Sequence, residues 1–244
     1  MRGENKIADL RVSVIIPAAG RGKRIKGFGV RKPFILLGNK PVLAYALGVF
    51  KKIKGVREII LVVNKKDLKL AKRCFGRVSE KIVEGQATRA GSVYNGIKVL
   101  DKDSDIVVIH DGVRPFVTKD VVMRSIAAAQ RFGAAVSAVP VIPTIKRADE
   151  NGFVVSTLNR RLLWEIQTPQ AFRKDLITKA FAGVHNPAAA GSRDREKSDC
   201  ITDDAMLVEK MGHKVKLVMG SYDNIKITTP KDLAVAKAMM KSPS

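Results

Sequence analysis

Aromatic residues, cysteines and acidic residues are all scarce in this 244-residue sequence. Aromatic residues make up 5% of the chain, so few side chains could stack on nucleic-acid bases. Cys74 and Cys200 stand far apart and without metal-ligand spacing, which favours neither a zinc site nor a disulfide framework. No apolar run reaches the length of a membrane span, and residues 1–11 lack the apolar core of a signal peptide. We therefore expect a cytoplasmic protein with no membrane attachment.

Positive charge is in large surplus, with 45 Lys and Arg residues against 23 Asp and Glu residues. A surplus of this size favours an anionic partner, either nucleic acid or a small phosphorylated substrate. The cations are spread along the whole chain, and no basic tract is interleaved with aromatic residues. We therefore expect small phosphorylated substrates and no nucleic acid. The alternative from another class is a basic nucleic-acid-binding protein without catalytic activity.

The pattern of apolar residues predicts one α/β domain over residues 1–244, because neither a linker nor an internal repeat interrupts it. Apolar runs bounded by turn residues or charged loops predict strands near residues 14–17, 58–63, 81–83, 105–110, 134–140 and 214–219. Helical spacing predicts helices near residues 41–50, 65–74, 88–100, 118–132, 174–181 and 202–211, and from 229 onward. This alternation is typical of a Rossmann-like, doubly wound and mostly parallel sheet, whose ligands bind beyond the carboxyl ends of the strands.

The loop after the first predicted strand combines small residues with cations. Residues 18–20 remove side-chain bulk where the backbone turns, so that amide groups could approach an anion closely. Arg24 and Lys32 belong to a group of cations that follows within the same loop. The loop matches neither G-x-G-x-x-G nor the G-K-[ST] ending of a P-loop. The alternative for this loop, taken alone, is a surface loop whose Lys and Arg side chains are solvated.

Residues 141–163 break the alternation of strands and helices. Pro143 stands near the start of this segment, and Asn151-Gly152 forms a turn between two short β-rich pieces. These features predict an extended β-arm or hairpin. An isolated hairpin is marginally stable, so its apolar residues must be buried against another surface, such as a second copy of the chain. Residues 185–199 are small and polar, and we expect them to form a mobile loop.

The first loop also carries a more specific pattern. It reads Pro-Ala-Ala-Gly-x-Gly-x-Arg over residues 17–24, with Lys-Pro-Phe at residues 32–34. This pattern resembles the signature loop of Rossmann-like nucleotidyltransferases, and within them the 2-C-methyl-D-erythritol 4-phosphate cytidylyltransferase family. Six further blocks resemble that family in the same order, at residues 85–93, 110–116, 144–148, 159–170, 201–205 and 223–228.

The resemblance implies transfer of CMP from CTP to 2-C-methyl-D-erythritol 4-phosphate, with release of pyrophosphate, in the non-mevalonate isoprenoid pathway. The attacking phosphate oxygen is already anionic, so the reaction needs cations to oppose accumulating charge rather than a general base. By this resemblance, Arg24 and Lys32 would stabilise the α-phosphorus and the departing pyrophosphate. Arg160 and Lys226 would position the attacking phosphate.

The resemblance also implies two binding sites, a metal and a homodimer. The implied nucleotide-binding residues are Ala18, Ala19, Gly20, Gly85, Arg89, Ser92 and Gly112. The implied substrate-binding residues are Asp111, Arg114, Thr144, Lys146 and Asp223. Mg²⁺ would be bound mainly through the CTP phosphates, with Asp111 nearby and no direct protein ligand. The arm would be exchanged across a homodimer, so that Thr144 and Arg160 would act in the partner's site.

Simpler interpretations remain for several of these residues. His110 is typical of a hydrogen-bonded core histidine, and Asp203 and Asp204 of an acidic pair favoured by a helix dipole. Lys226 could be a solvated strand residue. Gln86 departs from the family, which often has a second glycine there. Related ribitol 5-phosphate cytidylyltransferases share two of the blocks, but residues 144–147 and 224–226 favour methylerythritol phosphate as the acceptor.

Overall fold

The computed structural model describes residues 9–20, 31–185 and 201–241, so Arg24 and most of the expected mobile loop lie outside the described residues. A seven-stranded sheet has the order β11-β7-β10-β6-β1-β4-β5. The bounds of its strands are β1 Val12–Ala18, β4 Val56–Val63, β5 Lys81–Glu84, β6 Ile106–Ile109, β7 Ala134–Pro140, β10 Trp164–Arg173 and β11 Lys216–Met219. All neighbours in this sheet pair in parallel except β10, which is antiparallel to β6 and β7. The predicted Rossmann-like, mostly parallel sheet is confirmed.

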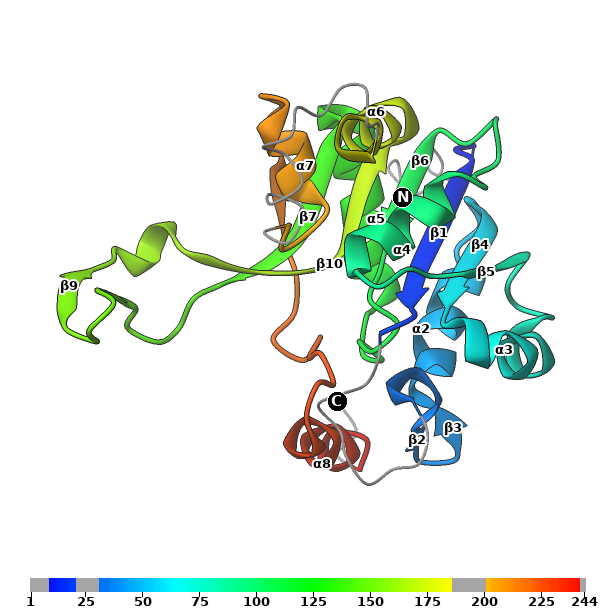
Figure 1. Cartoon of the computed structure of the whole chain (residues 1–244), viewed down its shortest axis with the longest axis horizontal. Coiled ribbons are helices and arrows are strands. Elements are labelled where there is room, and N and C mark those ends of the chain that lie inside the picture. The colour runs from blue at the N-terminus through cyan, green and yellow to red at the C-terminus, as the bar shows by residue number, and fades with distance from the viewer. Residues whose placement is uncertain (1–8, 21–30, 186–200, 242–244) are drawn as a thin grey trace.

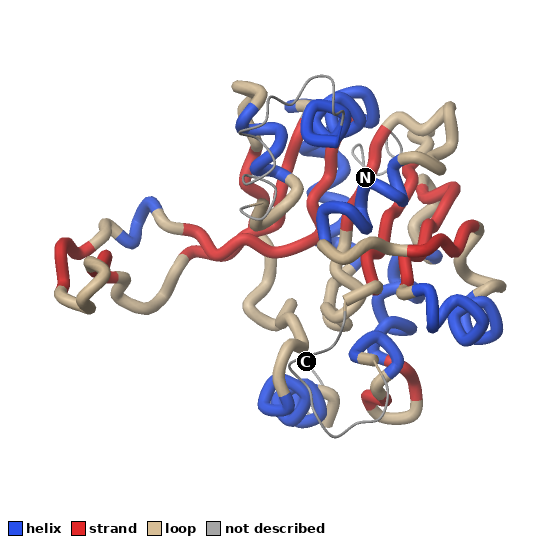
Figure 2. The backbone as a smooth tube through the Cα atoms, in the orientation of Figure 1, coloured by secondary structure: helices blue, strands red, loops and turns tan. Residues whose placement is uncertain are grey.

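Helices cover both faces of the sheet (Figures 1 and 2). Their bounds are α2 Val42–Lys51, α3 Leu68–Phe75, α4 Arg89–Ile97, α5 Lys119–Phe132, α6 Lys174–His185, α7 Ala205–Lys210 and α8 Pro230–Met239. None of the described helices has the length and apolar character needed to cross a membrane. Successive residues of β1 face opposite sides, so Val14 and Ile16 pack in the core under α2, α3 and α5. Ile15 packs in the second core, under α4, α6 and α7.

Local signals in the sequence explain where several helices begin and end. The side chains of Thr88, Thr118 and Thr229 accept hydrogen bonds from the first turns of α4, α5 and α8, as N-cap residues do. Gly133 ends α5 with a φ of 88°, a conformation that residues with a Cβ rarely adopt. The chain therefore turns directly from α5 into β7.

The C-terminal helix α8 packs on a small core of its own rather than on the sheet. Leu233 and Ala236 of α8 contact Ile35, Leu37 and Val42 from the region around the two-stranded hairpin of β2 (Leu36–Leu37) and β3 (Lys40–Pro41). The sequence pattern did not predict this hairpin. The packing of α8 fixes the far end of the chain segment 220–229, which crosses from β11 to α8 (Figure 1).

Strand β10 was also not predicted, because its central residues are polar and include Pro169. The ten-residue strand nevertheless lies between β6 and β7, with a register shift between Ile166 and Gln170. Gln167, Thr168 and Gln170 are buried there. A buried polar side chain needs a hydrogen-bond partner, and each of these three bonds to a different segment of the chain, as described below.

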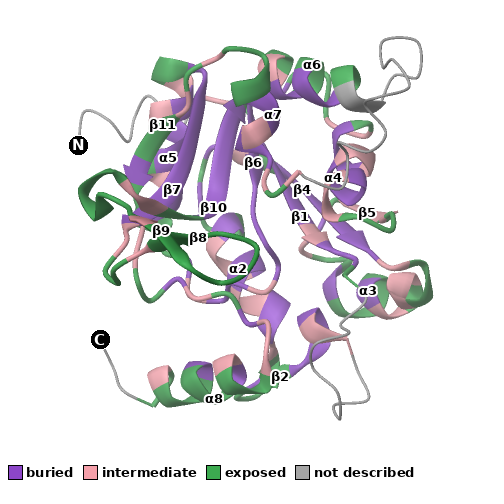
Figure 3. Ribbon diagram, turned by 60° about the vertical axis from the view of Figure 1, so that its left-hand side comes forward, coloured by how far each residue is buried: buried purple, intermediate pink, exposed green. Residues whose placement is uncertain are grey.

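The predicted arm is confirmed as a hairpin that projects away from the sheet (Figure 1). Its strands are β8 (Lys146–Ala148) and β9 (Val154–Thr157), and Gly152 in the turn has a φ of 85°. Most of the arm is exposed (Figure 3). Its exposed residues include large apolar side chains: Phe153 is 72% exposed and Leu162 is 77% exposed. In this single chain, the arm leaves its apolar surface uncovered.

A buried polar cluster joins the sheet strands at the end opposite to their carboxyl termini. Glu58 at the start of β4 is buried, and its Oε2 accepts hydrogen bonds from the hydroxyl of Ser13 and the backbone N–H of Asp101. Its other carboxylate oxygen pairs with the amine of Lys81 on β5. A charged group that is buried in this way is stabilising only while its partners remain in place.

We predict that Glu58→Gln lowers the free energy of unfolding by about 1–3 kcal/mol, because it removes the charge that faces Lys81. Urea denaturation followed by circular dichroism would measure the change. Arg57→Gln, at the exposed neighbouring residue, is the matched control and should change stability by less than about 0.5 kcal/mol. Equal stability of the two variants would contradict the prediction.

Candidate functional site

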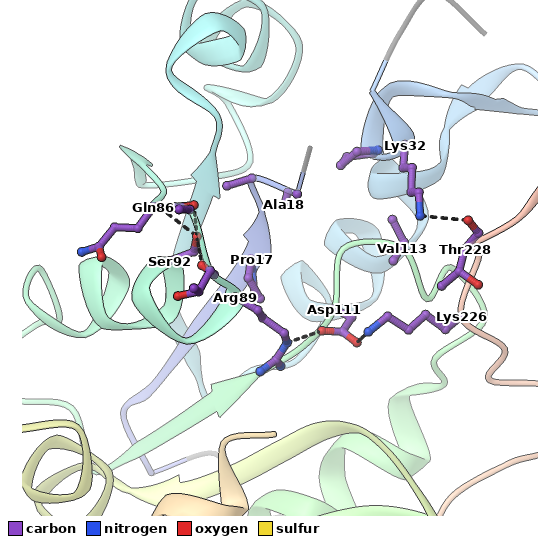
Figure 4. Close-up of a pocket in the computed structure, with 15 residues that line it drawn as sticks. Pro17, Ala18, Lys32, Gln86, Arg89, Ser92, Asp111, Val113, Lys226 and Thr228 are labelled. Atoms are coloured by element: carbon purple, nitrogen blue, oxygen red, sulfur yellow. Dashed lines mark hydrogen bonds and ion pairs between the residues drawn. The ribbon is translucent and has the colours of Figure 1, made fainter. Parts of the chain in front are cut away.

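A cleft of about 200 Å³ opens beyond the carboxyl ends of β1 and β6 (Figure 4). Its position agrees with the general rule for ligands of doubly wound sheets. The residues that line it are Pro17, Ala18, Ala19, Gly20, Lys32, Pro33, Gln86, Ala87, Thr88, Arg89, Ser92, Asp111, Val113, Lys226 and Thr228. The cleft therefore brings together Lys32, Lys226 and five of the seven residues predicted to bind nucleotide.

Gly85 and Gly112, the other two predicted nucleotide-binding residues, lie behind the cleft wall. A Cβ on Gly85 would come within 2.3 Å of Ala19 Cβ and 2.8 Å of Ser92 Oγ. A Cβ on Gly112 would come within 3.0 Å of Leu43 Cδ1. These glycines allow the loop after β1 to pack against its neighbours, which makes them supports of the cleft rather than parts of its described lining.

The first turn of α4 faces the cleft and is held by its own side chains. The hydroxyl of Ser92 accepts from the backbone N–H of Gln86 at 3.0 Å and donates to the carbonyl of Thr88 at 2.9 Å. The side-chain amide of Gln86 donates to Asn95 at 2.9 Å, which accommodates the residue that departs from the family pattern. A helix N-terminus presents partial positive charge, so this wall of the cleft suits an anion.

Asp111 follows His110, just after the end of β6, and it forms ion pairs with two cations. Arg89 Nε lies 2.9 Å from Asp111 Oδ1, and Lys226 Nζ lies 2.7 Å from Oδ2 (Figure 4). Arg114 Nε is further away, at 3.7 Å from Oδ2. Lys226 lies in irregular chain rather than in a strand, and its side chain is exposed but forms an ion pair with Asp111.

These ion pairs determine the protonation state of Asp111. Burial by itself raises the pKa of a carboxyl group, but the charges of Arg89 and then Lys226 outweigh that effect and hold the pKa of Asp111 well below its usual value. Burial by itself lowers the pKa of Arg89. The negative charges of Asp204 and Asp111 raise it by more than burial lowers it, so that the pKa of Arg89 is higher than usual. Asp111 is therefore an anion and Arg89 a cation at neutral pH.

The interpretation of His110 as a hydrogen-bonded core histidine is confirmed. Its ring is fully buried, and its Nε2 lies 3.1 Å from the carbonyl oxygen of Arg114, which can only accept. Nε2 therefore carries the hydrogen, and Nδ1 accepts from the hydroxyl of Thr168 at 3.1 Å. Thr168 Oγ1 also accepts from the backbone N–H of Asp111 at 3.0 Å. This chain of bonds fixes the backbone on which Asp111 is carried.

A second cleft, of about 520 Å³, lies on the other side of Asp111. It shares Arg89, Asp111 and Lys226 with the first cleft, so these three residues stand at the junction of the two. Arg114 lines the second cleft and donates from Nη1 to the backbone carbonyl of Asn224 at 2.7 Å. The remaining lining residues are Ile166, Gln167, Thr168, Gln170, Thr202, Asp203, Met206 and Glu209.

The segment that carries Lys226 is held in place from both sides. The buried side-chain amide of Asn224 donates to the carbonyl of Thr168 at 2.8 Å, and the side chain of Gln167 donates to the carbonyl of Ser221 at 2.8 Å. On the other side, Lys32 donates to the carbonyl of Thr228 at 2.9 Å. Strand β10 and the loop before β2 thus fix the approach of Lys226 to Asp111.

The other predicted substrate residues lie away from this junction. Thr144, Lys146 and Arg160 are on the projecting arm, where Lys146 Nζ donates to Thr157 and Arg160 Nη1 donates to the carbonyl of Ile142 at 3.0 Å. Asp223 is exposed and does not line either cleft in the described structure. Arg24 lies outside the described residues.

The predicted acidic pair does stand at the start of α7, but the prediction is complete for only one of its two residues. Asp203 Oδ1 accepts from the backbone N–H of Met206 at 3.1 Å, as a residue at a helix N-terminus does. Asp204, by contrast, is fully buried, and its Oδ2 pairs with Arg89 Nη1 at 2.8 Å. No local pattern distinguishes the two carboxylates, because the partner of Asp204 is more than 100 residues away along the chain.

Comparisons with known proteins agree with this geometry. The family model for 2-C-methyl-D-erythritol 4-phosphate cytidylyltransferase matches residues 12–242. The protein of that name from Caldanaerobacter subterraneus is 45% identical over 237 residues, which span 95% of this chain and 100% of that protein. The protein of that name from Alkaliphilus oremlandii is 44% identical over 238 residues, which span 95% of this chain and 96% of that protein.

Solved structures give the same result. The crystal structure of 4-diphosphocytidyl-2C-methyl-D-erythritol synthase from Anaerococcus prevotii matches with a TM-score of 0.80 and 35% identity, over 98% of this chain and 100% of that one. The crystal structure of 2-C-methyl-D-erythritol 4-phosphate cytidylyltransferase from Thermus thermophilus matches with a TM-score of 0.75 and 31% identity, over 96% of this chain and 100% of that one.

The enclosure of His110 predicts a pH dependence of stability. Burial lowers the pKa of His110 to about 4, from 6.5 in an exposed histidine, so below pH 6.5 the unfolded chain binds a proton that the folded chain does not. The free energy of unfolding therefore falls by about 2 kcal/mol through this group as the pH is lowered from 7 to 5. His110→Gln lacks this loss, so its stability deficit relative to the unmodified protein should shrink by that amount over the same range.

Urea denaturation at pH 7, 6 and 5 would measure the difference between the two proteins, in which the contributions of all other groups cancel. His213→Gln, at a partly exposed histidine next to Gly133 at the start of β7, is the matched control. A deficit of His110→Gln that stays constant with pH would show that His110 is not held neutral by burial.

Proposed function

Because the chain belongs to the 2-C-methyl-D-erythritol 4-phosphate cytidylyltransferase family, we infer that it transfers CMP from CTP to 2-C-methyl-D-erythritol 4-phosphate and releases pyrophosphate. This reaction belongs to isoprenoid biosynthesis by the non-mevalonate route. One observation supports it above all: two clefts meet at Asp111, where Arg89, Arg114 and Lys226 converge. A reaction that brings two anions together requires such a junction.

The chemistry needs no general base at this junction. An oxygen of the acceptor phosphate forms a bond to the α-phosphorus of CTP, and the bond from that phosphorus to the β-phosphate oxygen breaks. Pyrophosphate leaves with the electron pair, and the attacking oxygen is already ionised at neutral pH. The enclosed, neutral His110 agrees with this, because it cannot reach either cleft to accept a proton. Catalysis then depends on positioning and on cations directed at the transition state.

We assign CTP to the first cleft and the acceptor phosphate to the second. The small residues Ala18, Ala19 and Gly20, together with the start of α4, give the first cleft a wall of backbone amides that suits a triphosphate. Lys32 belongs to this cleft and is assigned to the triphosphate, as Arg24 is by the family resemblance. Arg114 and Lys226 reach the second cleft and supply the cations that an alcohol phosphate requires.

The donor groups also fit a Mg²⁺ ion that is bound mainly through the CTP phosphates. Among the described residues, no cluster of three or more His, Cys, Asp or Glu side chains could hold a metal by itself. Asp111 is the acidic residue of the first cleft, and both of its oxygens already have cationic partners. Mg²⁺ keeps several waters and binds phosphates readily, so one nearby carboxylate suffices. When bound, the ion would neutralise charge on the triphosphate.

We propose that the active form is a homodimer in the cytoplasm, with each arm lying over the partner. The arm exposes Ile142, Phe153, Val154 and Leu162 to solvent in the single chain, a surface that an isolated hairpin does not sustain in water. The same arm carries Thr144, Lys146 and Arg160 away from the clefts of its own chain (Figure 1). Exchange of the two arms around a twofold axis buries the apolar surface and brings these residues to the partner's second cleft.

The proposed reaction predicts that pyrophosphate is released from CTP in the presence of Mg²⁺ and 2-C-methyl-D-erythritol 4-phosphate. A coupled pyrophosphate assay measures this, with ribitol 5-phosphate as the competing acceptor and each substrate omitted in turn as a control. We expect kcat/KM to be higher with methylerythritol phosphate. Equal or higher kcat/KM with ribitol phosphate would overturn the acceptor, and no release with either acceptor would overturn the reaction.

The exchanged arm predicts that two inactive variants restore activity when they are mixed. Lys32→Ala removes a cation of the first cleft, and Arg160→Ala removes one on the arm. If the arm acts in the partner's site, each mixed dimer contains one site with both defects and one intact site. Random exchange of subunits should then restore roughly one quarter of the unmodified activity, because half of the dimers each have one of their two sites intact.

The control is each variant incubated alone under the same exchange conditions. Native mass spectrometry with one isotopically labelled variant would establish that mixed dimers form. Mixed dimers without restored activity would place Arg160 in the site of its own chain.

A further inference from the structure

Asp204 is a buried carboxylate that the reaction as described above does not use. It directly precedes α7 and is 0% exposed, and its Oδ2 lies 2.8 Å from Arg89 Nη1. Its other oxygen, Oδ1, has no hydrogen-bond partner among the described residues. Burial raises the pKa of this carboxyl group, and the adjacent Arg89 opposes that rise. Such a group is destabilising by itself, so its position calls for a reason beyond helix capping.

Asp204 is the first member of a row of four alternating charges. Arg89 donates from Nη1 to Asp204 and from Nε to Asp111, and Asp111 in turn pairs with Lys226. Figure 4 shows the part of this row that lines the first cleft, from Arg89 through Asp111 to Lys226. The planar guanidinium of Arg89 is thus held at two edges, and Asp204 supplies the hold on the side away from Asp111.

The backbone of Asp204 is fixed by the same strand that fixes Asp111. Gln170 Oε1 accepts from the backbone N–H groups of Asp204 and Ala205, both at 3.1 Å. Two residues earlier on β10, Thr168 Oγ1 accepts from the backbone N–H of Asp111 at 3.0 Å. Both carboxylates that hold Arg89 are therefore anchored to β10, and their separation is set by a buried strand rather than by mobile loops.

We propose that Asp204 is a positioning residue for cytidylyl transfer. It holds Arg89 so that Arg89 and Lys226 grip Asp111 from opposite sides, which keeps Lys226 at the junction where the two substrates meet. Without Asp204, Arg89 has one carboxylate instead of two, and its long side chain can take other rotamers. Arg89 then no longer holds the carboxylate of Asp111 in one position, and Lys226, which pairs with that carboxylate, is held less firmly. This proposal rests on the function inferred above, since the reaction gives the junction its role.

The test is steady-state kinetics of Asp204→Asn, a variant that keeps the shape of the side chain and removes its charge. We expect kcat to fall about 10- to 100-fold, by analogy with the loss of activity when the hydrogen-bond partners that orient metal ligands are removed. KM for CTP should change by a smaller factor than kcat, because the variant leaves Lys32 and the wall of residues 18–20 intact and alters the CTP cleft only through Arg89. A purely structural role would lower the amount of active protein without separating kcat from KM in this way.

Glu58→Gln is the matched control, because Glu58 is also a buried carboxylate with one cationic partner, at the far end of the sheet. It should lose stability yet keep the unmodified kcat per folded molecule. Thermal melting of both variants gives the folded fraction at the assay temperature. Arg89→Lys, which can reach only one of the two carboxylates, should show the same loss of kcat. The double variant with Asp204→Asn should lose less kcat than the product of the two single fold-losses, because both changes act on the same interaction.

Unmodified kcat per folded molecule in Asp204→Asn would overturn the proposal, as would a fall in kcat no larger than any fall measured in Glu58→Gln. Multiplicative effects of Asp204→Asn and Arg89→Lys on kcat would also overturn it. If Asp204→Asn does not fold, Arg89→Lys carries the same expected loss, and unmodified kcat in that variant overturns the proposal. Failure of the unmodified protein to transfer CMP would instead overturn the inferred reaction, which separates the two results.

Discussion

The burial of one ionised carboxylate, that of Asp111, is the constraint on which the site depends. Removing a carboxylate from water costs several kcal/mol unless cations and hydrogen bonds compensate for it. Here the compensation comes from Arg89 at the start of α4 and from Lys226 on the segment that leads to α8. Elements from distant parts of the chain must therefore converge on this one group, and the boundary between the two clefts lies where they do so.

Strand β10 provides the precision with which these elements converge. Its three buried polar residues each hold a different segment: Gln167 holds Ser221, Thr168 holds Asp111 through its backbone, and Gln170 holds Asp204. The strand is antiparallel to both of its neighbours, β6 and β7. A side chain locked within a sheet positions its partner more closely than a loop residue does, because its own rotamer is fixed by packing. One strand thereby sets the relative positions of both carboxylates that hold Arg89.

Features that depend on local sequence were predicted well, whereas features that depend on distant partners were not. Apolar runs such as Ala134–Pro140 identified the buried strands, and threonine caps such as Thr118 identified helix starts. Strand β10 was missed, because Gln167 and Gln170 resemble loop residues until their partners are known. Asp204 was missed for the same reason. Lys32 and Lys226, which line the first cleft, were named as candidate site residues only through the family resemblance, since a lysine has no local pattern that reveals an ion pair.

An acidic residue at the centre of a site for two anions needs an explanation, and the charges around it provide one. Arg89, Arg114 and Lys226 face the carboxylate of Asp111, and Asp204 also pairs with Arg89, so three positive charges against two negative charges leave a surplus of one. Without Asp111, the three cations would repel one another, and Lys226 would lose its ion-pair partner. With it, they are held in place before the substrates arrive, so little reorganisation is needed when charge develops at the α-phosphorus. The carboxylate neutralises part of the positive charge of the cations, but it fixes the cations at the position where the reaction requires them.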